Sequence, residues 1–425
     1  MYKSISIFVS SFSALLAVRW IYFKILKLAK EKGLVDNPDA RKLQKFPVPV
    51  LGGMAVFFGV TVGMLTGCAM YYTFNEGIAG AGAEFSHTRL IQVMLAMSVM
   101  LYTGSLDDIL GLTPRTRFVI EILVILGIVF SSDACMDSLH GLWGVQGFSR
   151  WAAVPLTVFA GVGIINAVNM VDGVNGLSSG LCITCSALFG SLFLYVGDIP
   201  NAILAFTMVA SLLPFFVHNV FGDKSRMFIG DGGTMIMGIL MTWFVISIIS
   251  GDSYPRLLDG NVCVVAMVLA FLSVPVADTL RVMTMRMLKG RSPFSPDKTH
   301  LHHAFVAIGV SHSITALSIV LINLTVVLVW YVSMKTGASL ECQLYIVILV
   351  AALLVWGNYI FLEHESRSDS RKARWLRDFS IRTHLGRKEW WQRFTYFLDA
   401  PEFDEHEREN LRMKMERKFV NKVKK

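Results

Sequence analysis

Two neighbouring carboxylates, Asp107 and Asp108, stand where a long apolar segment ends. Like charges side by side repel each other unless they share a cation or a proton. A divalent metal ion bound by both carboxylates would remove this repulsion, and a shared proton would make one carboxylate a candidate general base. The simpler alternative is a solvated pair that caps the following helix. We therefore predict an acidic centre here, with metal binding and proton transfer both open.

Oxygen-bearing side chains recur every three residues in the segment NAVNMVDGVNGL at positions 166–177. At helical spacing Asn166, Asn169, Asp172 and Asn175 share one face. Such a face offers amide and carboxylate oxygens to Mg²⁺, and the glycine turns that follow offer backbone N–H groups to phosphate. A polar helix end with its turn is the alternative, but capping does not require four such groups.

A glycine-rich stretch, FIGDGG at positions 228–233, stands directly before another long apolar segment. Glycine-rich backbone that enters a helix N-terminus is a common binding site for anions. Asp231 in this turn could bridge a metal ion to a pyrophosphate, and Phe228 could stack on a base. A turn with a purely structural role is the alternative.

Three histidines, His300, His302 and His303, follow Arg291 and Lys298 in one basic loop. Histidines beside cations suggest either a metal site or the recognition of an anion. We favour phosphate oxygens over zinc as their partners, and a solvated basic loop is the alternative.

Long apolar stretches separate these motifs and dominate the chain of 425 residues. Hydrophobic residues make up 54% of it and charged residues only 16%. This hydrophobic content exceeds what one soluble core requires. The net charge is +8, but the basic residues stand between and after the apolar runs. Anionic lipid and anionic substrates are therefore the expected partners, and nucleic acid is not. The six cysteines lie nearly all in apolar runs, so we expect neither disulfides nor zinc.

An all-α, polytopic transmembrane protein with about eleven transmembrane helices is the predicted fold. A helix needs about 20 apolar residues to cross the hydrocarbon core. The fourth span is short and carries Glu121, so ten is the alternative count. The predicted spans are residues 4–23, 48–73, 90–106, 117–131, 151–168, 177–196, 199–217, 232–250, 261–278, 313–334 and 343–362.

The basic residues gather in the loops that follow the odd-numbered spans, and such loops face the cytoplasm. The N-terminus is then outside and the C-terminus inside. All the polar motifs fall on the cytoplasmic side, where we expect an active-site cleft. From Glu363 to Lys425 the chain turns charged and aromatic, which predicts a cytoplasmic tail of interfacial helices. A solvated extension without a catalytic role is the simpler interpretation of this tail.

Five motifs in this order resemble those of the polyprenyl-phosphate N-acetylhexosamine-1-phosphate transferases, a family that also includes phospho-N-acetylmuramoyl-pentapeptide transferase. They are RKLQKFPVPVLGG at 41–53, LDD at 106–108, NAVNMVDGVNGL at 166–177, FIGDGG at 228–233 and PDKTHLHH at 296–303. The resemblance covers residues 1–362 and implies a transmembrane glycosyl-1-phosphate transferase domain there. It does not extend to the tail, residues 363–425.

The resemblance implies a phosphotransfer that depends on Mg²⁺, with Mn²⁺ as a substitute. The phosphate of a polyprenyl lipid would attack the sugar-linked phosphorus of a UDP-sugar and release UMP. Asp231 and Asn169 would bind the metal. The catalytic acidic centre would consist of Asp107, Asp108 and Asp172, and which of them is the base stays open.

The resemblance also assigns residues to the donor nucleotide. Phe228 would stack on uracil, and Asn175 would hydrogen-bond it. The residues that would contact the phosphates or the sugar nucleotide are Lys45, Arg291, His300, His302 and His303.

The His-Leu-His-His form is similar to the subgroup that uses UDP-GlcNAc and undecaprenyl phosphate in the bacterial inner membrane. That subgroup starts O-antigen, capsule, common-antigen or teichoic acid synthesis. Gln44, Asn175 and Lys298 depart from the usual pattern, so the sugar and the pathway stay open, as does a homodimer. Muramoyl-pentapeptide transfer is the alternative within the family. A transporter of lipid-linked sugars is the alternative of another class, although no inverted repeat is visible.

Overall fold

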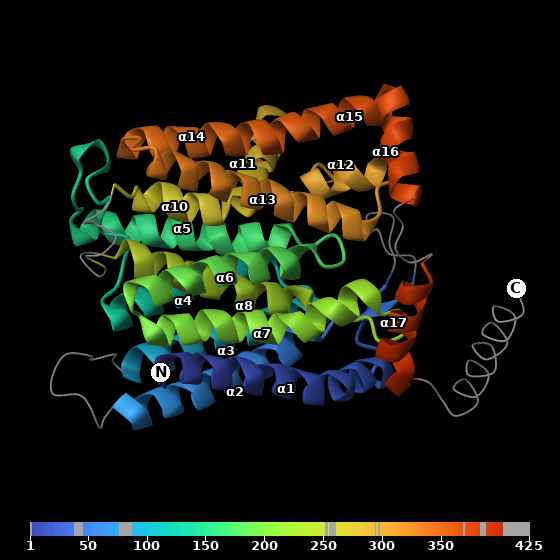
Figure 1. Cartoon of the computed structure of the whole chain (residues 1–425), viewed down its shortest axis with the longest axis horizontal. Coiled ribbons are helices and arrows are strands. Elements are labelled where there is room, and N and C mark those ends of the chain that lie inside the picture. Colours follow the sequence, from blue (N-terminus) through green and yellow to red (C-terminus); the bar gives the residue numbers. More distant parts are fainter. Residues whose placement is uncertain are drawn as a thin grey trace, which may run out of the picture.

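The computed structural model shows an all-α membrane protein whose long helices lie side by side in one bundle (Figure 1). It describes residues 2–37, 46–75, 87–250, 254, 261–293, 295, 298–368, 370–382 and 388–402. Within these ranges nine helices are long and apolar enough to cross a membrane, and one bent helix pair raises the count to ten. The predicted fold class is therefore confirmed, whereas the count of nine or ten is below the predicted eleven.

The long helices match most of the predicted spans and extend several of them by a few residues. They are α1 (Tyr2–Glu31), α2 (Gly52–Asn75), α3 (His87–Leu110), α5 (Arg150–Met170), α6 (Leu177–Val196), α7 (Ile199–Phe221), α8 (Gly230–Ile249) and α13 (His312–Lys335). The last span is continuous but has three parts, α14 (Leu340–Ala352), a π-helical turn (Leu353–Gly357) and α15 (Asn358–Ser368). Shorter helical turns lie at Leu142–Gly144 and Ala400–Glu402.

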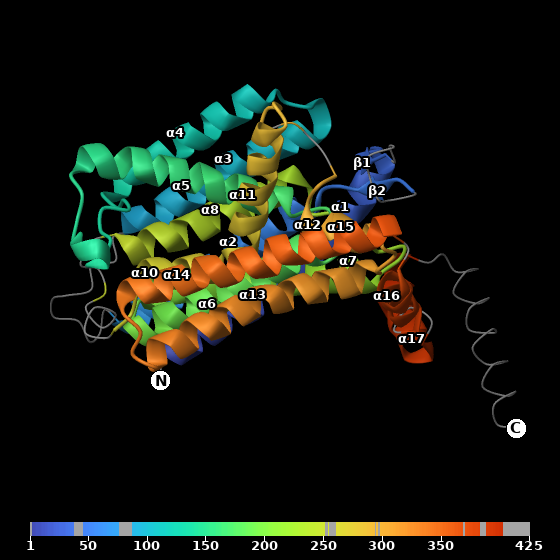
Figure 2. The same ribbon diagram turned by 90° about the horizontal axis from the view of Figure 1, so that it is seen from above.

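The predicted fourth span is a helix, α4 (Pro114–Ser132), but it is not among those that qualify as membrane spans. It has 19 residues, and its first half carries Arg115, Arg117 and Glu121. These charges exceed what a lipid-facing segment of this length tolerates. The helix packs against α3 and α5 within the bundle (Figure 2), so its charged half lies beside other helices.

The predicted ninth span at residues 261–278 is not one straight helix, because two helices meet there at an angle of 80°. They are α10 (Val264–Phe271) and α11 (Ser273–Leu288). A broken helix leaves backbone groups without partners, which is costly in an apolar interior. Asn323 of α13 supplies them: its amide oxygen accepts from the Val274 N–H, and its amide nitrogen donates to the last carbonyl of α10. The break lets α11 cross the other helices (Figure 2).

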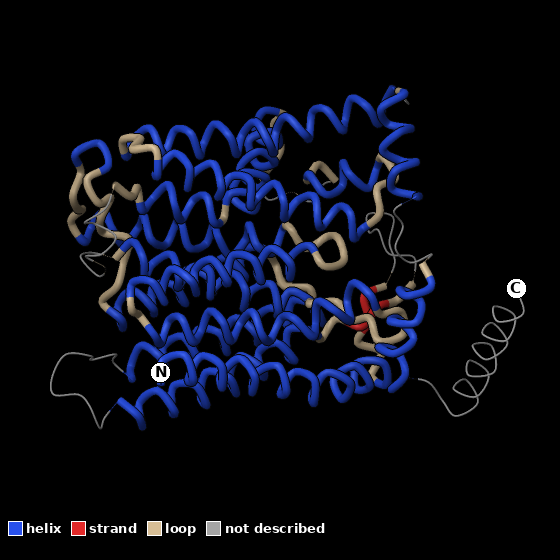
Figure 3. The backbone as a smooth tube through the Cα atoms, in the orientation of Figure 1, coloured by secondary structure: helices blue, strands red, loops and turns tan. Residues whose placement is uncertain are grey.

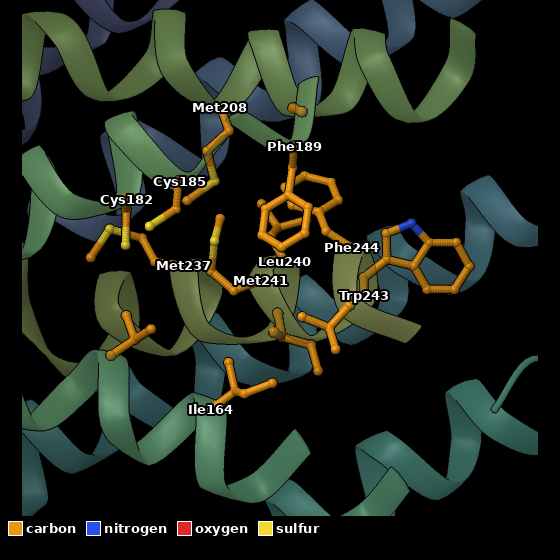
Figure 4. Packing of buried hydrophobic residues seen from close by; sticks show 14 of the residues in the cluster. Ile164, Cys182, Cys185, Phe189, Met208, Met237, Leu240, Met241, Trp243 and Phe244 are labelled. Atoms are coloured by element: carbon orange, nitrogen blue, oxygen red, sulfur yellow. The ribbon is translucent and has the colours of Figure 1, made fainter. Parts of the chain in front are cut away.

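Helix α8 forms the centre of the bundle, and its apolar window is 100% buried. A helix that is hydrophobic on all sides must be surrounded by other helices, and α8 contacts α2, α3, α5 and α6. Figure 4 shows its side chains Met237, Met241 and Phe244 packed against Phe189 and Cys185 of α6. The described cysteines are free, as predicted, and most of them are buried.

A small antiparallel sheet forms within the first loop of the chain (Figure 3). Its strands are β1 (Val35–Asp36) and β2 (Val48–Pro49). Backbone hydrogen bonds link this segment to the loop before α8: the Phe228 N–H donates to the Pro49 carbonyl of β2 at 2.7 Å, and the Gly52 N–H donates to the Phe228 carbonyl at 2.9 Å. Two segments about 180 residues apart in sequence are thus fixed side by side.

One end of the bundle carries the polar loops, the short helix α12 (Leu301–Ala307) and the tail helices α16 (Arg371–Arg382) and α17 (Glu389–Asp399). Figure 1 shows α16 and α17 lying across this end of the bundle. The interpretation of the tail as a merely solvated extension is wrong for these two helices, because each makes hydrogen bonds to the bundle.

We predict that Gly104→Ala destabilises the protein. A Cβ atom at this position of α3 would lie 2.4 Å from the backbone of Asp231 and Gly232 at the start of α8, so the two helices would have to separate. Such overpacking typically costs about 1–3 kcal/mol. The measurement is the thermal unfolding midpoint of the purified protein in detergent.

Gly127→Ala of α4 is the matched control, since a Cβ atom there meets nothing within 4 Å. It should leave the midpoint unchanged or raise it slightly, because alanine favours helix over glycine by about 1 kcal/mol. Equal midpoints for the two variants would contradict the close approach of α3 and α8.

Candidate active site

An arginine lies among three carboxylates at the polar end of the bundle. The Arg117 Nη1 atom is 3.1 Å from Asp107 Oδ2 and 3.8 Å from Asp231 Oδ2. Its Nε atom donates to Glu121 Oε1 at 3.3 Å. The side chains of Arg117, Asp107 and Glu121 are largely shielded from solvent, so their charges interact in a medium of low dielectric constant. Tertiary packing thus gathers acids from α3, α4 and α8 around one cation.

Glu121 is a site residue that the sequence interpretation missed. Its side chain is fully buried. Besides Arg117 it accepts from the Asn166 amide at 2.6 Å. The signal was present in the sequence, because a carboxylate inside an apolar helix is expensive and is usually functional.

Asp107 and Asp108 are neighbours in sequence, but they make different contacts. Asp107 accepts from the Leu112 N–H and from Arg117. Asp108 turns toward α8 and accepts from the backbone N–H groups of Asp231, at 3.0 Å, and Gly232. A carboxylate at this position satisfies donors that a helix N-terminus leaves unpaired and interacts favourably with the helix dipole. The structure therefore gives Asp108 a capping role, and its predicted catalytic role stays a prediction.

Gly230 makes this cap possible. Its φ of +71° lies in the left-handed region that favours glycine. A Cβ atom there would also lie 2.5 Å from Asp108 Oδ2.

Asn169 orients the carboxylate of Asp231. Its amide nitrogen donates to Asp231 Oδ1 and to the Thr234 hydroxyl, each at 2.7 Å. The two predicted metal ligands are therefore in direct contact, from α5 and α8. Whether they bind a metal stays a prediction.

Asp172 lies in the turn between α5 and α6, on the wall of a cavity. The surrounding protein removes part of the hydration of its carboxyl, and this desolvation raises the pKa to about 6. The hydroxyl of Ser178 donates to the carboxylate and lowers the pKa, whereas the charge of Asp231 raises it. Asp172 therefore changes its charge close to neutral pH, as a general base would.

The histidine motif begins with a buried ion-pair network. His300 Nδ1 lies 2.9 Å from Asp278 Oδ2 of α11. Arg281 donates to the other oxygen of Asp278 at 2.7 Å. His300 is therefore oriented by a carboxylate behind it, in the manner of histidines at many functional sites. Asp278 was missed in the sequence, because its helix was interpreted as the end of a straight span.

His302 stacks on His300, with ring centroids 5.6 Å apart, and its ring is tilted against that of His303, at 4.3 Å. Burial, reinforced by the charges of these neighbours, lowers its pKa well below the usual value, so the ring is neutral at pH 7. It fits against Gly173, where a Cβ atom would lie 2.2 Å from His302 Nε2. This contact joins the histidine motif to the turn that carries Asp172.

These groups surround one cavity of about 560 Å³. Six of the predicted site residues line it: Asp107, Asn169, Asp172, His300, His302 and His303. Cations that the sequence analysis did not select for the site also line it, namely Arg115, Arg117 and Arg286. A cavity with three arginines and three histidines beside an acidic centre is suited to a substrate that carries several phosphates.

The remaining predicted residues lie elsewhere. Asp231 reaches the acidic centre from beside the cavity, through Arg117. Arg291 is exposed, and Asn175 and Phe228 are partly buried. None of these three residues lines the cavity. Lys45 lies outside the described residues. The nucleotide contacts assigned to these residues stay predictions.

The acidic centre contains the donors that Mg²⁺ prefers. Asp107 and Asp231 approach the same guanidinium nitrogen of Arg117, so one cation already compensates the negative charges of both carboxylates. In the described part of the chain, no group of three or more His, Cys, Asp or Glu side chains is arranged to hold a metal by itself. Mg²⁺ often takes only one or two protein carboxylates and completes its shell with water and substrate phosphates. The residues fit an ion of this kind.

Comparison with protein families identifies the middle of the chain. Residues 90–249 match the model of glycosyl transferase family 4. This segment contains α3 to α8, and so it includes the acidic centre, Asp172 and the start of α8.

Similar proteins cover most of the chain. The undecaprenyl-phosphate alpha-N-acetylglucosaminyl 1-phosphate transferase of Escherichia coli (strain K12) is 30% identical over 291 residues, which span 67% of this chain and 72% of the relative. The protein of the same name from Yersinia pestis is 29% identical, over 68% of this chain and 73% of the relative. The probable undecaprenyl-phosphate N-acetylglucosaminyl 1-phosphate transferase of Bacillus subtilis (strain 168) is 30% identical, over 76% and 83%.

We predict that Arg117→Met destabilises the protein at neutral pH. Three carboxylates would lose their shared cation, and the removal of one partner from a buried ion pair costs about 3–5 kcal/mol. Arg115→Met is the matched control, because Arg115 is exposed and has no ion-pair partner among the described residues. Thermal unfolding in detergent measures both, and equal midpoints would contradict the role of Arg117 as the central cation.

Proposed function

Because the chain belongs to glycosyl transferase family 4, we propose that it transfers N-acetylglucosamine 1-phosphate from UDP-GlcNAc to undecaprenyl phosphate and releases UMP. The names of the relatives supply the acceptor and the transferred group. The observation that carries the proposal for this chain is the cavity, in which arginines and histidines face an acidic centre at the end of a membrane-spanning bundle.

The chain's own residues support the main steps of such a transfer. Arg115, Arg117 and Arg286 bind phosphate oxygens and balance the charge that develops on the departing UMP. Asp172 holds or accepts a proton beside the attacking phosphate, and its raised pKa suits this task. Asn169 keeps Asp231 oriented toward the centre. Mg²⁺ held by Asp231 and Asn169, the predicted metal ligands, would supply additional neutralisation of the diphosphate.

The location of the cavity supports a membrane-bound acceptor. It lies at the ends of α3 and α5, where apolar spans give way to polar turns. A phosphate headgroup is at this depth when its lipid tail stays in the hydrocarbon core. The basic loops at the same end favour the cytoplasmic side of a bacterial inner membrane, with the N-terminus outside. A homodimer stays a prediction.

The proposal is tested with the purified protein, undecaprenyl phosphate, Mg²⁺ and a panel of UDP-sugars. We expect UMP release with UDP-GlcNAc. Release only with UDP-muramoyl-pentapeptide would favour the alternative transferase. Transport of a lipid-linked sugar across proteoliposomes without UMP release would favour a transporter, and no turnover by folded protein with any donor would overturn the proposal.

Asp231→Asn should lower the rate of UMP release about 100-fold or more, because a metal ligand loses its charge and contributes several kcal/mol less to the transition state. Asp223→Asn is the matched control, since it makes the same change at an exposed position of the preceding loop. Calorimetric titration with Mg²⁺ gives a second readout. Activity and Mg²⁺ binding like those of wild type would remove Asp231 from the site.

The pH profile should depend on Asp172. Its pKa of about 6 is raised, so the carboxyl takes up a proton as pH falls through this value, and activity that needs the carboxylate should fall with it. Ser178→Ala removes a hydrogen bond that favours the charged form, so the acid limb should move to higher pH. Ser179→Ala is the control, because the buried Ser179 hydroxyl has no hydrogen-bond partner within the described residues. An unmoved limb in Ser178→Ala would exclude Asp172 as the titrating group.

A further inference from the structure

The tail helix α17 packs against the end of α7, directly before the glycine-rich loop. The ring of Trp391 lies 4.3 Å from that of Phe221, and Phe394 meets the same ring edge-on at 5.3 Å. The Thr395 hydroxyl donates to the Phe221 carbonyl at 2.8 Å. A carbonyl at the end of a helix lacks an intrahelical partner, so the tail satisfies a group that α7 leaves open.

The last residue of α17, Asp399, makes the most specific contact. Its carboxylate accepts from the consecutive backbone N–H groups of Asp223, Lys224 and Ser225, at 3.1, 3.0 and 3.0 Å, and from the Ser225 hydroxyl at 2.6 Å. Successive N–H groups that converge on one point form an anion-binding nest. Asp399 is only 3% exposed, so this nest is filled by the protein's own tail.

The opposite side of the same loop is held by the bundle. The Tyr22 hydroxyl of α1 donates to the Ser225 carbonyl at 2.8 Å. The Asn219 amide donates to the Met227 carbonyl at 2.9 Å, and Phe228 bonds to β2. Asp399 therefore completes a set of contacts that fixes the backbone from Gly222 to Ile229. This backbone leads directly into Gly230 and Asp231.

The other tail helix contacts the segment that follows the histidine motif. Arg377 of α16 donates to the Ile308 carbonyl at 3.1 Å, and the Ser380 hydroxyl accepts from the Ser311 N–H at 2.9 Å. These contacts lie at the end of α12, which carries His302 and His303. The two segments that the tail touches thus lie directly before Asp231 and directly after the helix of His302 and His303, and Figures 1 and 2 show α16 and α17 at this end of the bundle.

We propose that the tail is a clamp on the active-site loops, and that Asp399 is a positioning residue that holds the Gly222–Ile229 loop so that Phe228 and Asp231 are correctly placed. The catalytic part of this inference rests on the proposed function. The structural part does not, because the clamp is a set of contacts within the chain. It assigns a task to a segment that the motifs of the family do not reach.

The test compares the full-length variants Asp399→Asn and Glu389→Gln. The first replaces an acceptor-only carboxylate by an amide whose NH₂ group would face N–H donors. The second removes the same charge from the same helix, where Glu389 forms an exposed pair with Arg393. Hydrogen exchange of the peptide over residues 222–229 is measured for both, together with the KM for each substrate and kcat of UMP release.

We expect exchange at Asp223, Lys224 and Ser225 to become about tenfold or more faster in Asp399→Asn, with wild-type exchange in Glu389→Gln. In Asp399→Asn the KM for UDP-GlcNAc should rise or kcat should fall by about tenfold, because small misplacements of catalytic groups are costly. The KM for undecaprenyl phosphate should stay within about twofold of the wild-type value. A loss of folded protein alone would lower the amount of active enzyme but would not change a KM.

Unchanged exchange in Asp399→Asn would overturn the clamp, and faster exchange with wild-type kinetics would overturn its role in positioning. If wild type releases no UMP with any donor, the proposed function fails, whereas the exchange measurement still decides the clamp. If Asp399→Asn does not fold, Thr395→Val provides the milder variant, since it removes one hydrogen bond of the same contact. Its loop should exchange faster than wild type, and wild-type exchange would count against the proposal.

Discussion

The start of α8 is the point on which the rest of the structure depends. Three backbones converge there, and glycine is required because a Cβ atom at Gly53 or Gly104 would lie about 2.3–2.4 Å from the backbone of α8. The helix N-terminus leaves donors unpaired in a crowded place, and the Asp108 carboxylate satisfies two of them. Close packing and a charged cap together fix the position of Asp231, the first acidic residue of the central helix.

A buried charge cluster explains why the site lies at the end of the bundle and not in its middle. Charges that leave water need partners, and Arg117 with its carboxylates, like Asp278 with Arg281 and His300, forms a network that supplies them. The cavity lies at the ends of α3 and α5, where apolar spans give way to polar turns. Of the arginines in these networks, Arg117 also lines the cavity.

Parts of the chain outside the recognisable motifs hold the site together. One amide, Asn323, allows a membrane helix to break and α11 to bring Asp278 behind His300. One carboxylate, Asp399, joins the tail to the loop before α8. In both cases a buried polar side chain satisfies backbone groups that would otherwise lack partners, and this requirement makes such contacts specific.

The apolar periodicity and length of the segments sufficed to predict an all-α membrane protein, because the cost of an unpaired backbone in lipid leaves few other folds. The order of the motifs sufficed to predict the family and six residues of the cavity wall, from Asp107 to His303, since side-chain chemistry limits what can bind a diphosphate. The different contacts of Asp107 and Asp108, the inclusion of Arg117 and Glu121, the 80° break before α11 and the docking of the tail required the tertiary structure. These features depend on which groups far apart in sequence come into contact. Ser225 and Asp399, for example, are separated by 174 positions, and the local sequence around each of them does not show that they meet.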